Sequence, residues 1–226
     1  MAKGQQERAL ATRRILLLAA AEVFDECGYA GAGIAKILQR TDLTAGALYF
    51  HFGSKQGLAQ AVMNAQPEAL SIPEDVKGMQ KLIDLLLTWS FQLQRDPLLR
   101  AGVRLTDEQA TFGMRDVTPY STWRTIMQDC LEEAHGAGDL RAGVEPERVA
   151  TFLVGTCTGL QTYSQVESGR EDLPERVLDL WRLLLPGIAS PEAVERLEVG
   201  VERVDPALRT PRQQAAEKVG ARGMQP

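Results

Sequence analysis

The side chains best suited to chemistry lie close together in one short stretch of the chain. Thr44, Tyr49, His51 and Lys55 supply a hydroxyl, a phenol, an imidazole and an ammonium group. All four can donate a hydrogen bond to a phosphate oxygen. The residues at 45–47 are small, so a base edge or a phosphate can come close. Each residue alone also fits an ordinary boundary position, but together they favour binding to DNA.

Catalytic and metal-binding alternatives find little support in the sequence. There are two histidines, His51 in this stretch and His135 beside a glycine-rich helix end. Cys27, Cys130 and Cys157 are far apart, so neither a zinc site nor a disulfide framework is expected. No nucleophile elbow or phosphate-cradling glycine loop occurs. We therefore expect no enzyme, no metal site and no cofactor.

Two short helices must position the donor groups. The apolar spacing predicts one helix over 34–40 and a second that begins after Thr44. Two short helices joined by a turn of this length are typical of a helix-turn-helix motif. Thr44 is the expected N-cap of the second helix. A helix of about seven residues is not stable alone in water. The side chains expected to hold it against the fold are Leu48, Tyr49, Phe50 and Phe52.

Helical periodicity also dominates the rest of the chain, and the expected fold class is all-α. Helices predicted over 8–26 and 55–66 flank the helix-turn-helix, with Gly28 ending the first and Ser54 capping the second. A last amphipathic helix is expected over 194–204. The predicted division is a three-helix DNA-binding head over 8–66, a helical body over 67–204 and a flexible tail over 205–226.

The net charge of −5 hides an uneven distribution. Residues 1–60 have a balance of +2, whereas the rest of the chain has a balance of −7. The acidic body would repel DNA and leave the contact to the head. Because +2 is small, we expect a clear but moderate salt dependence of DNA binding. The lack of a long apolar run or an export signal predicts a cytoplasmic protein with no membrane partner.

The segment LTAGALYFHFGSKQGL (43–58), with RRILLLAAAEVFDECGYAG upstream, closely resembles the signature of tetracycline-repressor-like (TetR-like) regulators. The resemblance covers about residues 8–60. It implies a three-helix head on double-stranded operator DNA, an all-helical body for ligand binding and dimerisation, and a homodimer. It also implies release of the DNA when a small molecule binds the body.

The resemblance assigns phosphate contacts to Thr44, Tyr49, His51 and Lys55. The whole DNA-binding set comprises Lys36, Thr44, Ala45, Gly46, Ala47, Tyr49, His51 and Lys55, of which 45–47 face the bases. The chain departs from the pattern twice. Ala45 stands where close relatives often have lysine, and Ala32-Gly33 replaces the usual Ser or Thr cap of the first short helix. Both departures leave the operator sequence open.

Four further segments, GALYFHF, PLLRAGVRL (97–105), YSTWR (120–124) and GTCTGLQ (155–161), resemble the γ-butyrolactone receptor subfamily of antibiotic-producing filamentous bacteria. This likeness implies a γ-butyrolactone, furan or butenolide autoregulator as ligand, a pseudo-palindromic operator and control of antibiotic genes. The alternatives are a multidrug- or antibiotic-sensing repressor and a pseudo-receptor with a different ligand.

Such a ligand needs an apolar tube for its tail and one or two polar groups for its ring. Trp123 matches the subfamily's pocket tryptophan, with a core aromatic as the alternative. The expected ligand contacts are Trp123, Gln66, Thr158, Leu82, Leu86, Trp89, Val103, Met127, Phe152 and Thr162.

Helices predicted over 147–166 and 175–189 are expected to form a four-helix bundle across a two-fold axis. Trp181 fits an intramolecular core equally well. The expected dimer contacts are Val177, Leu180, Trp181, Leu184, Leu185 and Ile188.

Overall fold

The computed structural model describes residues 2–70 and 75–209, and the expected all-α class is confirmed. Two compact units are present. The first contains the chain up to Ala69 together with Arg95–Thr122, and the second contains Leu70–Gln94 and the chain from Trp123 onward. Residues 95–122, expected in the body, thus fold with the head. Within the described ranges, no helix is long and apolar enough to cross a membrane.

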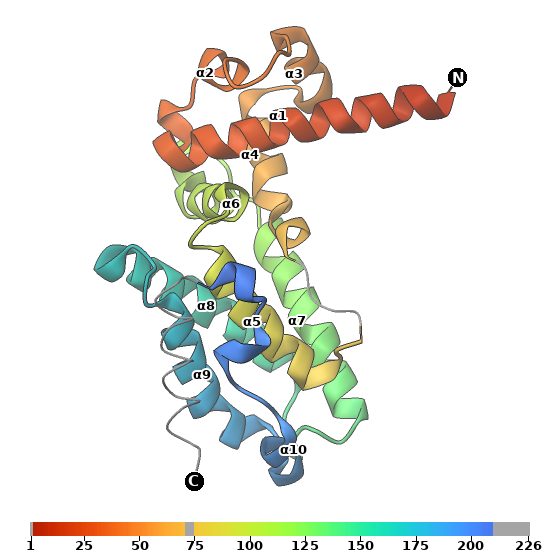
Figure 1. Ribbon diagram of the computed structural model, residues 1–226, viewed down its shortest axis with the longest axis vertical. Coiled ribbons are helices and arrows are strands. Elements are labelled where there is room, and N and C mark those ends of the chain that lie inside the picture. Colours follow the sequence, from red (N-terminus) through yellow and green to blue (C-terminus); the bar gives the residue numbers. More distant parts are fainter. Residues whose placement is uncertain (1, 71–74, 210–226) are drawn as a thin grey trace. The chain divides into compact units, whose positions relative to one another are not determined.

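The first unit is organised around α1. In Figure 1 the short helices α2 and α3 lie on one side of it, α6 lies on the other, and α4 crosses α1. Leu16, Phe24 and Leu48 are fully buried members of the core that these helices share. The elements of this unit are α1 (Ala2–Gly31), α2 (Ile34–Leu38), α3 (Ala45–Phe52), α4 (Lys55–Asn64), η1 (Gln66–Ala69), α6 (Pro97–Glu108) and η2 (Gln109–Phe112).

The predicted caps of the short helices are confirmed. The Thr44 hydroxyl oxygen accepts a hydrogen bond from the backbone N–H of Ala47 at 3.2 Å. Ser54 Oγ accepts one from the N–H of Gly57 at 3.0 Å. Gly33 caps α2 without a side-chain hydrogen bond. Thr44 and Ser54 each satisfy one backbone N–H that the first turn of a helix cannot pair, whereas Gly33 leaves the corresponding N–H groups of α2 to water.

Gly28, expected to end the first helix, instead kinks it. Its φ of +66° lies in the left-handed region, and α1 continues to Gly31. The N–H of Tyr29 is freed by the kink and donates to Glu108 Oε2 at 3.1 Å. A Cβ at position 28 would lie 2.7 Å from Arg104 Nη2 and 2.8 Å from Glu108 Oε2. Backbone conformation and packing therefore both require glycine here.

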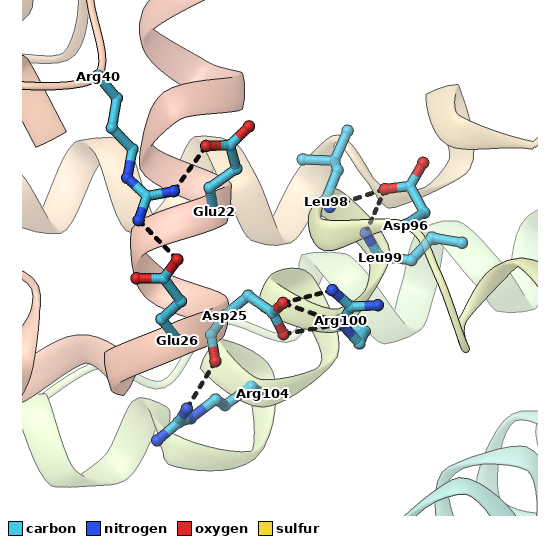
Figure 2. Close-up of polar contacts among 9 residues, drawn as sticks. All are labelled: Glu22, Asp25, Glu26, Arg40, Asp96, Leu98, Leu99, Arg100 and Arg104. Atoms are coloured by element: carbon cyan, nitrogen blue, oxygen red, sulfur yellow. Dashed lines mark hydrogen bonds and ion pairs between the residues drawn. The ribbon is translucent and has the colours of Figure 1, made fainter. Parts of the chain in front are cut away.

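Two sets of charge pairs fix α1 to its neighbours (Figure 2). Arg40, which follows α2, donates to Glu22 at 2.7 Å and to Glu26 at 2.6 Å. Arg100 of α6 makes a bidentate pair with Asp25, with its closest contact at 2.7 Å. Since Asp25 and Arg100 are both partly buried, salt screens this pair less than an exposed one.

The second unit is built around α5, in which every residue from 82 to 91 is buried. A helix that is covered all round belongs to a core rather than to a surface. α9 packs against both α5 and α8. The elements are α5 (Gly78–Gln92), α7 (Thr118–Gly136, in this unit from Trp123), α8 (Pro146–Ser168), α9 (Leu173–Ile188), α10 (Pro191–Arg196), η3 (Val201–Arg203) and η4 (Pro206–Leu208).

The amphipathic helix predicted over 194–204 is wrong, because α10 already ends at Arg196. The chain then crosses α5 (Figure 1), where the Arg203 guanidinium donates to both carboxylate oxygens of Asp84 at 2.8 and 2.7 Å. Asp84 is 5% exposed, and a buried carboxylate needs such a partner. Of the predicted tail, 205–209 includes η4, and 210–226 lies outside the described residues.

We expect Gly28→Ala to lower the free energy of unfolding by about 2 kcal/mol. The backbone conformation at this position (φ +66°, ψ −177°) is adopted almost only by glycine and costs other residues about 1–3 kcal/mol, and the alanine Cβ would displace the Arg104–Glu108 pair. Urea unfolding followed by circular dichroism measures the decrease. Gly136→Ala is the control, since a Cβ there meets nothing within 4 Å. Equal stability of the two variants would contradict the role given to Gly28.

Candidate nucleic-acid interface

α3 turns one face to the core and leaves the other bare. Leu48 is fully buried and Phe52 packs beside it, partly buried. Phe50 is 83% exposed and Tyr49 is 49% exposed. The prediction that all four hold α3 is correct for Leu48 and Phe52 and wrong for Phe50 and Tyr49. At about 100° per residue, Phe50 lies about 200° round the helix from Leu48, so the two cannot share a face.

Phe50 is the residue of this surface that the sequence-based set omitted. Its side chain lies four residues after Gly46, on the same line along α3. The sequence could have shown this, because Phe50 shares a helix face with Gly46 and therefore lies opposite the buried Leu48. The ring leans edge-on against His51, with centroids 5.2 Å apart, and otherwise faces solvent. A large exposed aromatic in a recognition surface is available to a partner.

Gly46 leaves part of the α3 surface without a side chain, although packing within the chain does not require a glycine at this position. A Cβ at this position would meet only Thr44 Oγ, at 3.7 Å, which is ordinary contact. Glycine inside a helix costs about 0.5–1 kcal/mol relative to alanine. With Ala45 also exposed, this part of the surface lets another backbone approach α3 closely.

Thr44 caps the N-terminus of α3, and Lys55 is the first residue of α4, just after the turn that follows α3. The Thr44 oxygen accepts from the Ala47 N–H, so its own proton can be donated outward at the helix N-terminus, where phosphate binds well. Lys55 Nζ lies 4.4 Å from the ring centroid of Tyr29, and burial lowers the pKa of this lysine. His51 is half-buried beside Phe50.

Lys36 is engaged within the chain. Its Nζ donates to Cys27 Sγ at 2.8 Å and lies 3.4 Å from Glu26. The hydrogen bond to Cys27, followed by the Glu26 carboxylate, raises the pKa of Lys36. A phosphate contact by Lys36, which stays a prediction, would have to compete with these partners.

Two family profiles match the chain. The profile of bacterial regulatory proteins of the tetR family matches residues 16–62, and that of the tetracyclin repressor-like C-terminal domain matches 77–190. The chain belongs to the TetR family. The first match contains the whole of α2 and α3, and the second contains α5 to α9.

Three relatives show where in the TetR family the chain stands. It is 36% identical to the A-factor receptor protein of Streptomyces griseus over 86% of this chain and 70% of that protein. The crystal structure of full-length TylP, a TetR regulator from Streptomyces fradiae, has 42% identity and a TM-score of 0.79, covering 88% of this chain and 89% of TylP. A γ-butyrolactone receptor, ArpA-like, has 26% identity and a TM-score of 0.58, covering 84% and 93%.

This TetR-family chain is a transcriptional repressor close to the A-factor and γ-butyrolactone receptors, not an enzyme. TetR regulators bind operator DNA and small-molecule ligands, typically as dimers.

The ten expected ligand contacts are divided between the units. Gln66 and Val103 belong to the first, where Gln66 is buried, donates to the Met63 carbonyl at 2.9 Å and packs against Gly102. In the second unit, Phe152 is 55% exposed and Thr162 is also exposed. The others in that unit, Leu82, Leu86, Trp89 and Met127, are buried, and Trp123 and Thr158 are half-buried.

A polar cavity of about 320 Å³ in the second unit involves none of the expected contacts. Four of its charged groups form ion pairs at 2.6 Å, Arg196 with Asp139 and Arg203 with Glu198. The lining does not suit an alkyl tail. It is made by Lys77, Gln80, Asp139, Arg196, Leu197, Glu198 and Arg203.

The expected dimer residues on α9 are mostly used inside the chain. Val177, Trp181, Leu185 and Ile188 are at most 8% exposed in the single chain, so a partner has almost nothing left to cover. The prediction is corrected for these four, and Trp181 is a core residue. Leu180 and Leu184 keep partial exposure. These four residues are buried because α9 packs its apolar stripe against α5.

We expect Tyr49→Ala to weaken binding to operator and to random duplex alike, by about tenfold, because one charge-assisted hydrogen bond to phosphate is removed. Phe50→Ala should also weaken binding, while the free energy of unfolding changes by less than about 0.5 kcal/mol, as for an exposed position. Fluorescence anisotropy and urea unfolding measure the two quantities. A selective decrease in operator binding would instead make Tyr49 a base reader.

Proposed function

We propose that this repressor is an autoregulator receptor. It binds a pseudo-palindromic operator as a homodimer and is released by a small lactone, furan or butenolide, and thereby controls antibiotic genes. The observation that carries the proposal is the 36% identity to the A-factor receptor protein over 86% of the chain. That span extends beyond the head, which many TetR regulators share, into the body that selects the ligand.

The second unit has the chemistry that such a ligand requires. α5 contributes the buried apolar side chains Leu82, Leu86 and Trp89, and Met127 of α7 is also buried. Trp123, on α7, is half-buried, so its indole ring combines an apolar surface with an N–H donor. An alkyl tail among the aliphatic side chains and a ring oxygen at Trp123 would satisfy both ends of the ligand.

The proposed dimer surface lies on α8 rather than on the buried stripe of α9. Phe152, Gly155, Gly159, Tyr163 and Val166 are all exposed and fall within about 100° of arc on α8. Nothing lies within 4 Å of a Cβ at either glycine, so a second helix could approach closely. On α9, which packs against α8, Leu183 is a further large apolar side chain and is 83% exposed. Phe152, expected in the ligand pocket, is assigned here to the dimer.

Release of DNA follows from differential binding. Two recognition helices on a two-fold dimer must reach major grooves about one DNA turn apart. A ligand that prefers a body shape in which the heads are spaced differently shifts the population away from the DNA-binding shape. The shift can be no larger than the difference in ligand affinity between the two shapes.

The ligand is tested with a panel of γ-butyrolactones, furans, butenolides and antibiotics. We expect one of the first three to bind and to abolish the electrophoretic shift of operator DNA at saturation. Trp123→Ala should bind it at least tenfold more weakly by calorimetry while still shifting operator, whereas Trp123→Phe should keep most of the affinity. A panel in which only antibiotics bind would favour a pseudo-receptor or drug sensor instead.

The dimer is tested by placing charge on the proposed surface. We expect Val166→Glu with Leu183→Glu to give a monomer in analytical ultracentrifugation, because like charges would face each other across a two-fold interface. Val117→Glu, at a 73% exposed site in the first unit, is the control and should remain a dimer. An unchanged dimer in the double variant would reject this surface.

A further inference from the structure

The cations of the helix-turn-helix are largely used inside the chain. Arg40 and Lys36 both contact Glu26, and Lys55 is half-buried over an aromatic ring. Residues 15–60 carry three Lys and Arg against four Asp and Glu. An interface with this balance lacks the positive charge that supplies most of the non-specific part of DNA affinity.

The missing charge lies at the N-terminal end of α1, in a segment that we call the arm, residues 4–14. It contains three arginines and one glutamate, and Lys3 precedes it. Arg8, Arg13 and Arg14 are exposed, and within the described ranges none of them has an ion-pair partner. The arm therefore carries positive charge that the fold itself does not use.

The arm begins beside the end of α3. The guanidinium carbon of Arg13 lies 5.1 Å from the ring centroid of Phe52, the last residue of α3. From there α1 continues toward its N-terminus and projects beyond α3 (Figure 1). At about 1.5 Å per residue, Gly4 is about 13 Å further along the helix. The arm precedes residues 16–62, so it lies outside the matched tetR profile.

We propose that the arm binds the phosphate backbone of the DNA flanking the bases that α3 reads. The inference rests on the proposed function, because it requires α3 to lie on DNA. Guanidinium groups suit this partner, since they pair with phosphate in a bidentate manner and are weakly hydrated. Duplex DNA offers about one negative charge per 1.7 Å, so arginines spread along and around the arm find phosphates without base specificity.

The experiment uses the full chain and an operator selected with it from a random duplex library. The operator is prepared in two lengths, as the core alone and with ten further base pairs on each side. The variant is Arg8→Gln with Arg14→Gln, which leaves Arg13 on Phe52 and so does not disturb α3. The matched control is Lys77→Gln with Arg141→Gln, which removes the same charge from two exposed positions in the second unit.

We expect the wild type and the control to bind the long duplex at least tenfold more tightly than the short one, and the arm variant to bind both lengths with similar affinity. The slope of log affinity against log salt on the long duplex should fall by about 0.9 for each phosphate that the variant no longer neutralises. On the short duplex the arm variant and the control should bind alike.

Three results would overturn the proposal. The arm variant could keep the full gain from the flanks, the flanks could have no effect on the wild type, or the variant could change only the oligomeric state in ultracentrifugation, which would make the arm a protein contact. Failure of the proposed function is a separate result, because the wild type would then select no operator from the library.

Discussion

The attachment of α1 to its neighbours is the constraint on which the first unit depends. α2 and α3 have five and eight residues, too few to stay helical without a support. Arg40 ties the end of α2 to Glu22 and Glu26, and Arg100 holds α6 on Asp25 of the same helix segment (Figure 2). A shift of α6 along α1 would break the bidentate pair, so these helices are expected to move as one body. The position of the exposed face of α3 is therefore fixed by the contacts that hold α1 to α2 and α6.

The same attachment has an electrostatic consequence. Glu22 and Glu26 neutralise Arg40, and Glu26 also faces Lys36, so cations that sequence alone would assign to DNA are used to hold the fold. What α3 then presents is small or aromatic: Ala45, Gly46, Tyr49 and Phe50. A surface of this kind contributes close approach and shape, whereas long-range attraction must come from charge elsewhere. Structural cohesion and DNA affinity compete for the same few arginine and lysine side chains.

Local rules predicted the head well because its signals are local. A cap such as Thr44 or Ser54 depends on the three residues that follow it, and the buried stripe of α1 depends on its own periodicity. The failures involve partners far away in sequence. Arg203 lies in the short 3-10 helix η3 instead of the predicted α-helix and pairs with Asp84, 119 residues earlier, and Gly28 kinks α1 toward Glu108. The prediction for Phe50 failed for another reason, since an aromatic residue type favours burial although its position on the helix faces outward.

The second unit shows why an apolar stripe alone cannot identify an interface. The stripe of α9 that contains Val177 and Trp181 is wide and apolar, and a dimer contact is its natural interpretation. A central helix that is buried all round, however, must be covered by its own chain before any partner arrives. Burying side chains such as Leu82 and Leu86 stabilises the fold by about 2 kcal/mol each. α5 thus takes the apolar face of α9. What remains for a partner is the stripe that the core left uncovered, and on α8 that stripe is marked by glycine as much as by large apolar residues.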